Sequence, residues 1–216
     1  IYKALDDISR ERKLTPEERA EQKKYTRLAD AFTPLAKGMN SEYANQNAYD
    51  AIQIHGGSGF IMEYKSQRLY RDARIFSIYE GTTQLQVVAA IRYITNGTYL
   101  TMMKEMLETE VAEELCPLKV RIEEMVKRYE QSINYVKESG SQEVNDLLAR
   151  RLYDMTAEII MSLLILDDAT RAPELFAKSA NVYVRMAEEN VVGKSLFVQS
   201  FIAEDIKFYR QTVKES

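Results

Sequence analysis

The sequence predicts an all-α protein in which amphipathic helices pack into a bundle. Apolar residues recur at spacings of three and four along almost the whole chain, and the strict alternation that is typical of half-buried strands is missing. Turn-forming residues are rare, with only 8 Gly and 4 Pro among 216 residues. Because each apolar stripe has to be covered by another element, helix-on-helix packing is expected.

Composition and charge exclude several classes of function. Hydrophobic residues make up 45% and charged residues 29%, which is the balance of an ordinary globular protein. The net charge of -4 provides no basic field for a nucleic acid. No apolar run reaches the length that spans a bilayer. With Cys116 and His55 as the single residues of their types, neither a disulfide framework nor a Cys/His zinc site is expected, and no metal is predicted.

The N-terminal region predicts a short helix over residues 1–12 and then a long one. Thr15 and Glu18 have the spacing of a capping box, and Pro16 suits the first helical position. The following stripe predicts a helix of roughly 55 Å at about 1.5 Å per residue; it comprises Tyr25, Leu28, Phe32, Leu35, Met39, Tyr43, Ala44, Ala51 and Ile52. Pro34 lies inside this stripe and is expected to kink or locally break the helix.

A glycine cluster ends the long helix. Three glycines in residues 56–59 are not expected to propagate a helix, and they permit positive φ angles and close backbone approach. A short helix is predicted over 66–74, and the apolar residues 75–79 could be extended. Thr82 or Thr83 is expected to cap a further helix that ends near residues 96–97 and carries Leu85, Val88, Ile91 and Ile94.

The second half of the chain predicts a series of amphipathic helices. One ends at residues 139–141 and carries Leu118, Ile122, Met125, Tyr129, Ile133 and Val136. The next carries Leu148, Leu152, Met155, Ile159, Leu163 and Leu166. Pro173 is expected to open a helix with Phe176, Val182 and Met186, and a last helix is expected after Gly193 with Leu196, Phe201, Ile206 and Tyr209.

Candidate chemistry is concentrated between residues 53 and 84. The glycine cluster is either a turn between helices or a surface on which backbone approaches a phosphate or a planar ring. Glu80 is either a carboxylate at a helix N-terminus, favoured by the helix dipole, or a general base whose strength is raised by desolvation beside a pocket. His55 is more typical of a hydrogen-bonded turn residue than of a catalytic one. Cys116 is expected to be inert.

Three linked blocks in this region resemble the C-terminal signature of the FAD-dependent acyl-CoA dehydrogenases. They read QIHGGSGF at 53–60, RLYRDARI at 68–75 and IYEGTTQ at 78–84. The resemblance is sharp over 35–94 and looser over 1–34. It implies that residues 1–100 form part of the family's C-terminal four-helix bundle. Residues 101–216 resemble a helical extension that some bacterial and very-long-chain-like members carry.

The resemblance assigns roles to individual residues. Glu80 matches the base that removes the α-proton of an acyl-CoA thioester, while the β-hydrogen leaves as hydride to the flavin and trans-2-enoyl-CoA is formed. Gly81 and Tyr79 match substrate contacts at the thioester and the acyl pocket. Contacts to the FAD of the same site are matched by Thr82, Thr83 and Gln84. Contacts to the adenosine half of an FAD held by a neighbouring subunit are matched by Gln53, Ile54, His55, Gly56 and Gly57.

The resemblance also carries expectations about the whole protein. It implies electron-transfer flavoprotein as electron acceptor, a homodimer or homotetramer, and a role in fatty acid β-oxidation. The family's N-terminal helical and β domains are absent here, so the isolated chain is expected to be inactive. A bacterial-like cytoplasmic location is expected, with the mitochondrial matrix left open by the missing N-terminus.

Three alternatives stay open from the sequence. An acyl-CoA oxidase shares the glutamate base but admits oxygen to the flavin. A non-catalytic helical interaction domain could keep the signature by descent. For the extension, packing on the bundle with a dimer interface is weighed against a membrane-facing surface, which the acidic net charge disfavours.

Overall fold

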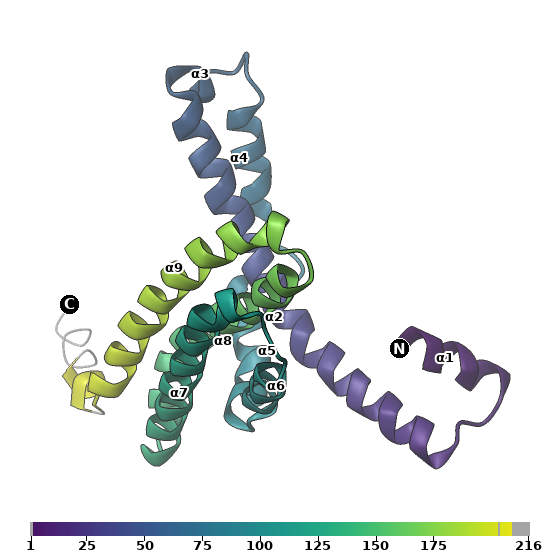
Figure 1. Ribbon diagram of the computed structural model, residues 1–216. Coiled ribbons are helices and arrows are strands. Elements are labelled where there is room, and N and C mark those ends of the chain that lie inside the picture. Colours follow the sequence, from purple (N-terminus) through teal and green to yellow (C-terminus); the bar gives the residue numbers. More distant parts are fainter. Residues whose placement is uncertain (1, 203, 209–216) are drawn as a thin grey trace. The chain divides into compact units, whose positions relative to one another are not determined.

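The computed structural model describes residues 2–202 and 204–208. Within these residues all regular secondary structure is helical, which confirms the predicted all-α class (Figure 1). The chain divides into two compact units, Ile1–Gln86 and Val87–Ser216. No helix among the described residues is long and apolar enough to cross a membrane.

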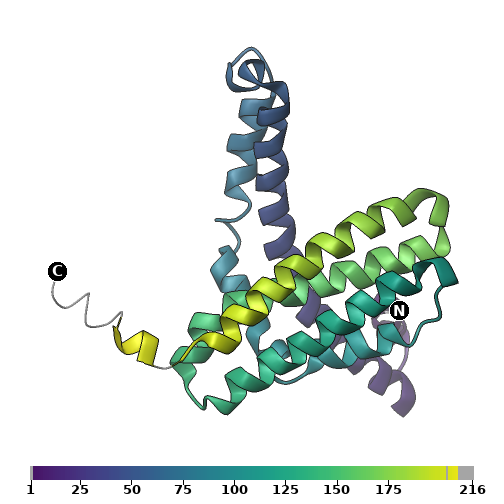
Figure 2. The same ribbon diagram turned by 60° about the vertical axis from the view of Figure 1, so that its left-hand side comes forward.

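The first unit is built around one long helix. Its elements are α1 (Tyr2–Glu11), α2 (Pro16–His55), α3 (Gly57–Phe60) and α4 (Ser66–Ile75), and it contains the start of α5 (Thr83–Thr95). The C-terminal part of α2 and helix α4 lie side by side and are joined through α3 (Figures 1 and 2). This hairpin places the segment after α4 beside the middle of α2.

The start of α2 has the predicted capping box. The Oγ1 of Thr15 accepts from the N–H of Glu18 at 3.2 Å, and the Glu18 carboxylate accepts from the N–H of Thr15 at 2.9 Å. Arg12 adds two guanidinium contacts to the same carboxylate, at 2.6 and 2.8 Å. Hydrogen bonds from Arg12, followed by the one from Thr15, lower the pKa of Glu18 to about 2.

We expect Arg12→Met to raise the pKa of Glu18 toward its usual value of 4.5, because the largest cause of the depression is removed. Folding lowers this pKa, so the carboxylate stabilises the helix start fully above pH 4.5 and loses this contribution as the pH falls toward 2. NMR titration of the Glu18 carboxyl carbon measures the shift. An unchanged titration curve in the variant would contradict the assignment to Arg12.

Helix α2 continues through Pro34 without a break, so the alternative of a local break is wrong. The helix ends at His55, as predicted, where Gly56 adopts a φ of 59°. The glycine cluster nevertheless forms the one-turn helix α3 over Gly57–Phe60, which corrects the expectation that these glycines exclude helix. A single positive φ at Gly56 is enough to end α2, after which helical backbone resumes.

Two further predictions near α5 are corrected. Residues 76–80 form turns and a bend rather than an extended stretch, with the N–H groups of Ile78 and Tyr79 both bonded to the carbonyl of Ile75. No described strand lies beside them to pair with. Thr82 caps α5, since its Oγ1 accepts from the N–H of Leu85 at 3.3 Å. The buried stripe of α5 is also different from the predicted one and consists of Thr83, Val87, Ala90, Tyr93 and Ile94.

The second unit is a helical bundle (Figure 2). It comprises the rest of α5, then α6 (Thr98–Leu107), the 3₁₀ turn η1 (Glu113–Leu115), α7 (Cys116–Glu138), α8 (Gln142–Arg171) and α9 (Pro173–Ser200). Every apolar residue predicted for the stripes of α7 and α8 is buried, so these two helices are confirmed. Helix α6 was not predicted from the sequence.

The two helices that the sequence predicts after Pro173 and after Gly193 form one continuous helix in the structure. Helix α9 runs through Gly193 without interruption, because one helical glycine weakens a helix by only about 1 kcal/mol and does not end it. Its buried stripe consists of Ala180, Val184, Ala187, Val191, Ser195 and Val198. The predicted stripe residues Phe176, Val182 and Met186 are instead exposed. Phe201 is buried beyond the helix end, and Tyr209 lies outside the described residues.

Polar contacts tie the three long helices together. The hydroxyl of Tyr129 in α7 lies 2.7 Å from that of Thr156 in α8, in a fully buried pair. Arg121 of α7 forms an ion pair with Glu188 of α9. The second contact and the buried stripe of α9 hold its inner face against the bundle, so its opposite face points away from the bundle.

Candidate active site

The segment after α4 folds back on α2 and forms an open pocket. The pocket has a volume of about 410 Å³ and is lined by Ala36, Lys37, Asn40, Ser41, Ala44, Phe76, Tyr79 and Glu80. Both parts of its lining belong to the first unit. Helix α2 supplies a rigid wall with two small alanines, and the segment supplies the aromatic rings and the carboxylate.

Lys37 holds this segment in place through its backbone. Its ammonium Nζ donates to three carbonyl oxygens, those of Phe76 at 2.7 Å, Tyr79 at 3.0 Å and Gly81 at 2.6 Å. The buried Ser41, one helical turn further along α2, shares its single hydroxyl hydrogen between the Lys37 carbonyl at 2.7 Å and the Phe76 carbonyl at 2.9 Å. An ammonium has three donors, and here all three are used on one turn of backbone. Lys37 therefore fixes the path of the chain on both sides of Glu80.

The backbone at Glu80 is in an unusual conformation. Glu80 has a φ of 53°, and among the described non-glycine residues it alone has positive φ. Gly81 follows with a φ of 89°. The left-handed region costs an ordinary L-residue about 1–2 kcal/mol, whereas glycine adopts it freely. Strained backbone at a carboxylate beside a pocket is typical of functional sites.

The polar groups of Glu80 are open to solvent. The residue is exposed, so the described residues do not supply the desolvation that the sequence led us to expect. Among the residues that the structure describes, none accepts a hydrogen bond from the Glu80 N–H, while its carbonyl is 3.5 Å from the amide nitrogen of Gln86. Glu80 thus lines the pocket, carries a carboxylate and has a backbone N–H without an acceptor among the described residues.

The three predicted FAD contacts after Gly81 differ in their surroundings. Thr83 is buried and its hydroxyl donates to the Glu42 carboxylate at 2.6 Å, which anchors the start of α5 to α2. Thr82 is exposed and caps α5, and Gln84 is exposed. Thr82 and Gln84 are therefore accessible to a ligand, whereas the Thr83 hydroxyl is already engaged.

The other predicted cofactor contacts form a separate cluster at the end of α2. Gln53, Ile54, His55, Gly56 and Gly57 are all exposed. The Nδ1 of His55 lies 2.7 Å from the carbonyl of Ala51, which is the hydrogen bond expected of a turn histidine. Along α2 about 18 Å separate Ser41 from Gln53, at roughly 1.5 Å per residue. The structure therefore keeps the predicted residues in two groups.

Lys37 and Ser41 were missed by the sequence reasoning. Neither belongs to the three recognised blocks, and Lys37 occupies a position that a helical pattern assigns to the solvated face. The only available signal was that a lysine interrupts the apolar and small residues between Pro34 and Ser41. Its carbonyl partners lie about 40 residues away, so the contact could not be read from local spacing.

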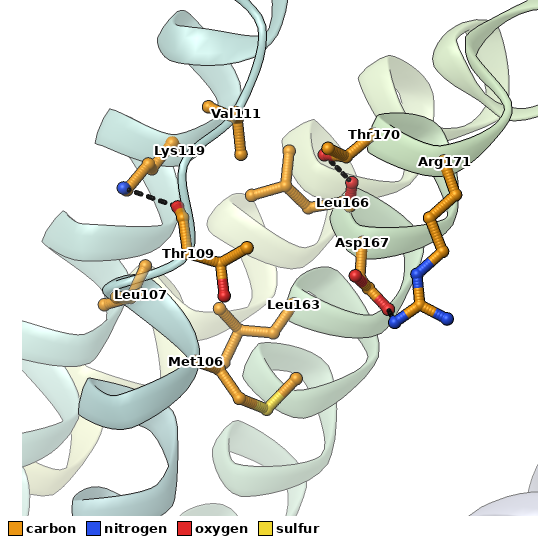
Figure 3. Close-up of a pocket in the computed structure, with 10 residues that line it drawn as sticks. All are labelled: Met106, Leu107, Thr109, Val111, Lys119, Leu163, Leu166, Asp167, Thr170 and Arg171. Carbon is orange, nitrogen blue, oxygen red and sulfur yellow. Dashed lines mark hydrogen bonds and ion pairs between the residues drawn. The ribbon is translucent and has the colours of Figure 1, made fainter.

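A second pocket lies in the second unit between α6, α7 and α8 (Figure 3). It has a volume of about 230 Å³, and its charged side chains pair with one another or with backbone. Lys119 donates to the carbonyl of Thr109 at 3.0 Å, Thr170 donates to that of Leu166 at 2.8 Å, and Arg171 pairs with Asp167 at 2.8 Å. Because the charged side chains that line it all have partners, this pocket is not a candidate catalytic site.

Comparison with known protein families agrees with the fold. Residues 11–94 match the family model "Acyl-CoA dehydrogenase, C-terminal domain" and residues 95–206 match "Acyl-CoA dehydrogenase C terminal". A solved acyl-CoA dehydrogenase family protein from Porphyromonas gingivalis is 37% identical, with a TM-score of 0.50 over 53% of this chain and 98% of that one. The chain belongs to the acyl-CoA dehydrogenase family.

Two other relatives are longer than the part they share with this chain. The CarC subunit of the caffeyl-CoA reductase-Etf complex of Acetobacterium woodii is 56% identical over 52 residues, which is 24% of this chain and 14% of CarC. An acyl-CoA dehydrogenase from Bacillus anthracis, solved in complex with FAD, is 20% identical with a TM-score of 0.61, over 76% of this chain and 32% of that one. The chain thus corresponds to less than two thirds of the length of either relative.

Proposed function

We propose that the whole protein carrying this chain is a flavin-dependent acyl-CoA dehydrogenase, with Glu80 as its catalytic base. The observation that supports this most directly is the Lys37-held segment, in which Glu80 lines a pocket and carries both a carboxylate and a backbone N–H without an acceptor among the described residues. The same residue could then remove a proton and stabilise the resulting negative charge. Residues 1–100 would supply this site, and residues 101–216 would form the helical extension.

The reaction requires two groups to act on adjacent carbons of the acyl chain. The Glu80 carboxylate would take the α-proton of the thioester, and its N–H would donate to the thioester oxygen on which negative charge develops. FAD, when bound, accepts the β-hydrogen as hydride, so that trans-2-enoyl-CoA is the product. Tyr79 would form a wall of the acyl pocket, and Gly81 would meet the thioester end. Substrate and flavin would also exclude the water that now surrounds Glu80.

The residues present fit a flavin in two places. Beside Glu80, the exposed Thr82 and Gln84 offer a hydroxyl and an amide, and Thr83 would contribute through its backbone. At the end of α2, a Cβ built on Gly56 or Gly57 would meet no atom within 4 Å, so this surface is open to a flat ring. The separation of the two groups agrees with contacts to two different FAD molecules in an oligomer.

The partners follow from the family and from CarC. Acyl-CoA is the proposed substrate, and an electron-transfer flavoprotein is the proposed acceptor, since CarC belongs to an Etf complex. The shared flavin would make the protein a homodimer or homotetramer, and its role would be fatty acid β-oxidation. Without the domains that complete the flavin pocket, the isolated chain would be inactive.

The match to CarC favours one variation, which is net reduction of an enoyl-CoA by the same groups in reverse. An acyl-CoA oxidase is a further alternative within the family. Reaction of an enoyl-CoA with the reduced protein would identify the reverse direction. Oxygen consumption without an added acceptor would identify the oxidase.

Anaerobic titration of the purified whole protein with a saturated acyl-CoA tests the proposal. We expect an oxidised-flavin absorption band that bleaches when the substrate is added. A flavin band that no acyl-CoA bleaches would contradict the proposed reaction. Absence of a flavin band after reconstitution with FAD would contradict the cofactor assignment and favour the helical interaction domain.

A further inference from the structure

Helix α9 has a second stripe with large apolar residues, on the face that points away from the bundle. The inner stripe packs on α7 and α8. The outer stripe is exposed, and its large apolar members are Leu175 (68%), Val182 (58%), Met186 (59%) and Leu196 (60%). They are interleaved with three small residues and one acidic residue, which are Ser179, Gly193, Ser200 and Glu189. A helix with apolar residues on two opposite faces is normally covered on both.

The spacing of the outer stripe is that of a helix-pairing surface. Its eight positions, from Leu175 to Ser200, follow one another at alternating steps of four and three residues, which is the heptad spacing of coiled-coil a and d positions. The inner stripe of the same helix deviates from this alternation, since Val191 and Ser195 follow Ala187 at two successive steps of four. The outer face is therefore suited to a single antiparallel or parallel helix rather than to a loop or a flat surface.

We propose that this outer face of α9 pairs with the same face of a second copy of the chain, in antiparallel orientation about a two-fold axis near Met186 and Glu189. Such an interface is isologous, so each position meets its symmetry counterpart. In this register the layers are Leu175 with Ser200, Ser179 with Leu196, Val182 with Gly193, and Met186 with Glu189. Each large apolar residue thus meets a smaller or polar one.

Gly193 supports this register. It lies inside a long helix with ordinary helical φ, where glycine costs roughly 0.5–1 kcal/mol relative to alanine. A Cβ at this position would meet no atom within 4 Å, so nothing among the described residues requires glycine. A second helix that approaches closely, with Val182 opposite Gly193, would leave no room for a side chain at this position and would explain the glycine.

Charge complementarity supports the same register. Glu189, the acidic member of the stripe, would insert beside Arg185 of the second copy, and Arg185 would lie beside Glu189 of that copy. Within its own chain, Arg185 uses its Nε on the side chain of Asn181 at 3.1 Å, which leaves the other guanidinium nitrogens for a partner. Two symmetric ion pairs would therefore flank the axis. A parallel pairing would place Glu189 next to Glu189 without this compensation.

Sedimentation velocity of the 216-residue chain tests the proposal, with Val182→Asp as the disrupting variant. The wild type is expected as a dimer of twice the 25.0 kDa chain mass, or a multiple of it, and Val182→Asp is expected to halve the mass. Val120→Asp on α7 is the matched control, because Val120 is the same residue type with 61% exposure, and it should leave the mass unchanged. Circular dichroism confirms that all three proteins are folded.

Charge reversal tests the register itself. Arg185→Glu and Glu189→Arg should each weaken self-association, because each places like charges at both symmetric contacts. A mixture of the two single variants should associate again, because the mixed dimer has one acidic and one basic partner at both contacts. A monomeric wild type, an unchanged mass in Val182→Asp, or no recovery in the mixture would overturn the proposal.

Discussion

Substitution Glu80→Gln in the whole protein is expected to slow the reduction of bound flavin by acyl-CoA by about 10²–10⁴-fold, the usual loss when a general base is removed. The amide has nearly the shape of the carboxylate, and the Lys37 hydrogen bonds are to backbone, so the segment should keep its conformation. Anaerobic stopped-flow absorbance measures the rate. Flavin content should be unchanged, since Glu80 is not a proposed FAD contact.

Glu110→Gln is the control for this experiment. Glu110 is an exposed glutamate between α6 and η1 with no role in the proposed site, and its substitution should leave the rate unchanged. A loss of less than tenfold in Glu80→Gln would exclude Glu80 as the base. Glu80 would then be an ordinary residue of a strained turn.

Substitution Lys37→Met is expected to slow flavin reduction by roughly 10- to 150-fold. Lys37 does not touch the proposed reacting atoms, so it is a positioning residue that acts through the backbone around Glu80. A hydrogen bond from a charged donor is worth about 1.5–3 kcal/mol, and that amount of lost positioning corresponds to the stated range of rates. Without the ammonium, the backbone around Glu80 loses three hydrogen bonds that hold it while Glu80 has a positive φ.

Three comparisons separate positioning from general stability. Lys24→Met, on an exposed part of the same helix, should leave the rate unchanged. Lys37→Arg should restore part of the rate, because a guanidinium also donates to several carbonyls. A variant that is only less stable would lose active protein with heating but would keep its kcat per bound flavin at low temperature, and that outcome would contradict a positioning role.

The packing of a helix could be predicted where the apolar stripe identified in the sequence is the stripe that the structure buries. In α7 and α8, all residues of the predicted stripes are buried, because these positions lie on the faces that pack in the bundle. In α5 and α9, more than one face carries apolar residues, and periodicity alone could not decide which face is inside. Much of the predicted α5 stripe, and the predicted Val182 and Met186 stripe of α9, lie outside the buried faces for this reason.

The part of the candidate site whose residues are close together in the sequence could be predicted. Glu80, Gly81 and the threonines after them lie in one block of sequence whose composition marks a turn before a helix. Lys37 and Ser41 come from the middle of α2, and their contacts to this block depend on the hairpin of α2 and α4. The positive φ of Glu80 likewise follows from those contacts and not from a residue type that favours it.

The sequence by itself determined the all-α class, the start of α2, the buried faces of α7 and α8, and the block that carries Glu80, because each depends on spacings of a few residues. Only the tertiary structure decided that Lys37 holds the Glu80 segment and that α9 is one helix with its inner face formed by alanines, valines and a serine. Both depend on which surfaces meet, and that is set by packing between residues far apart in the chain.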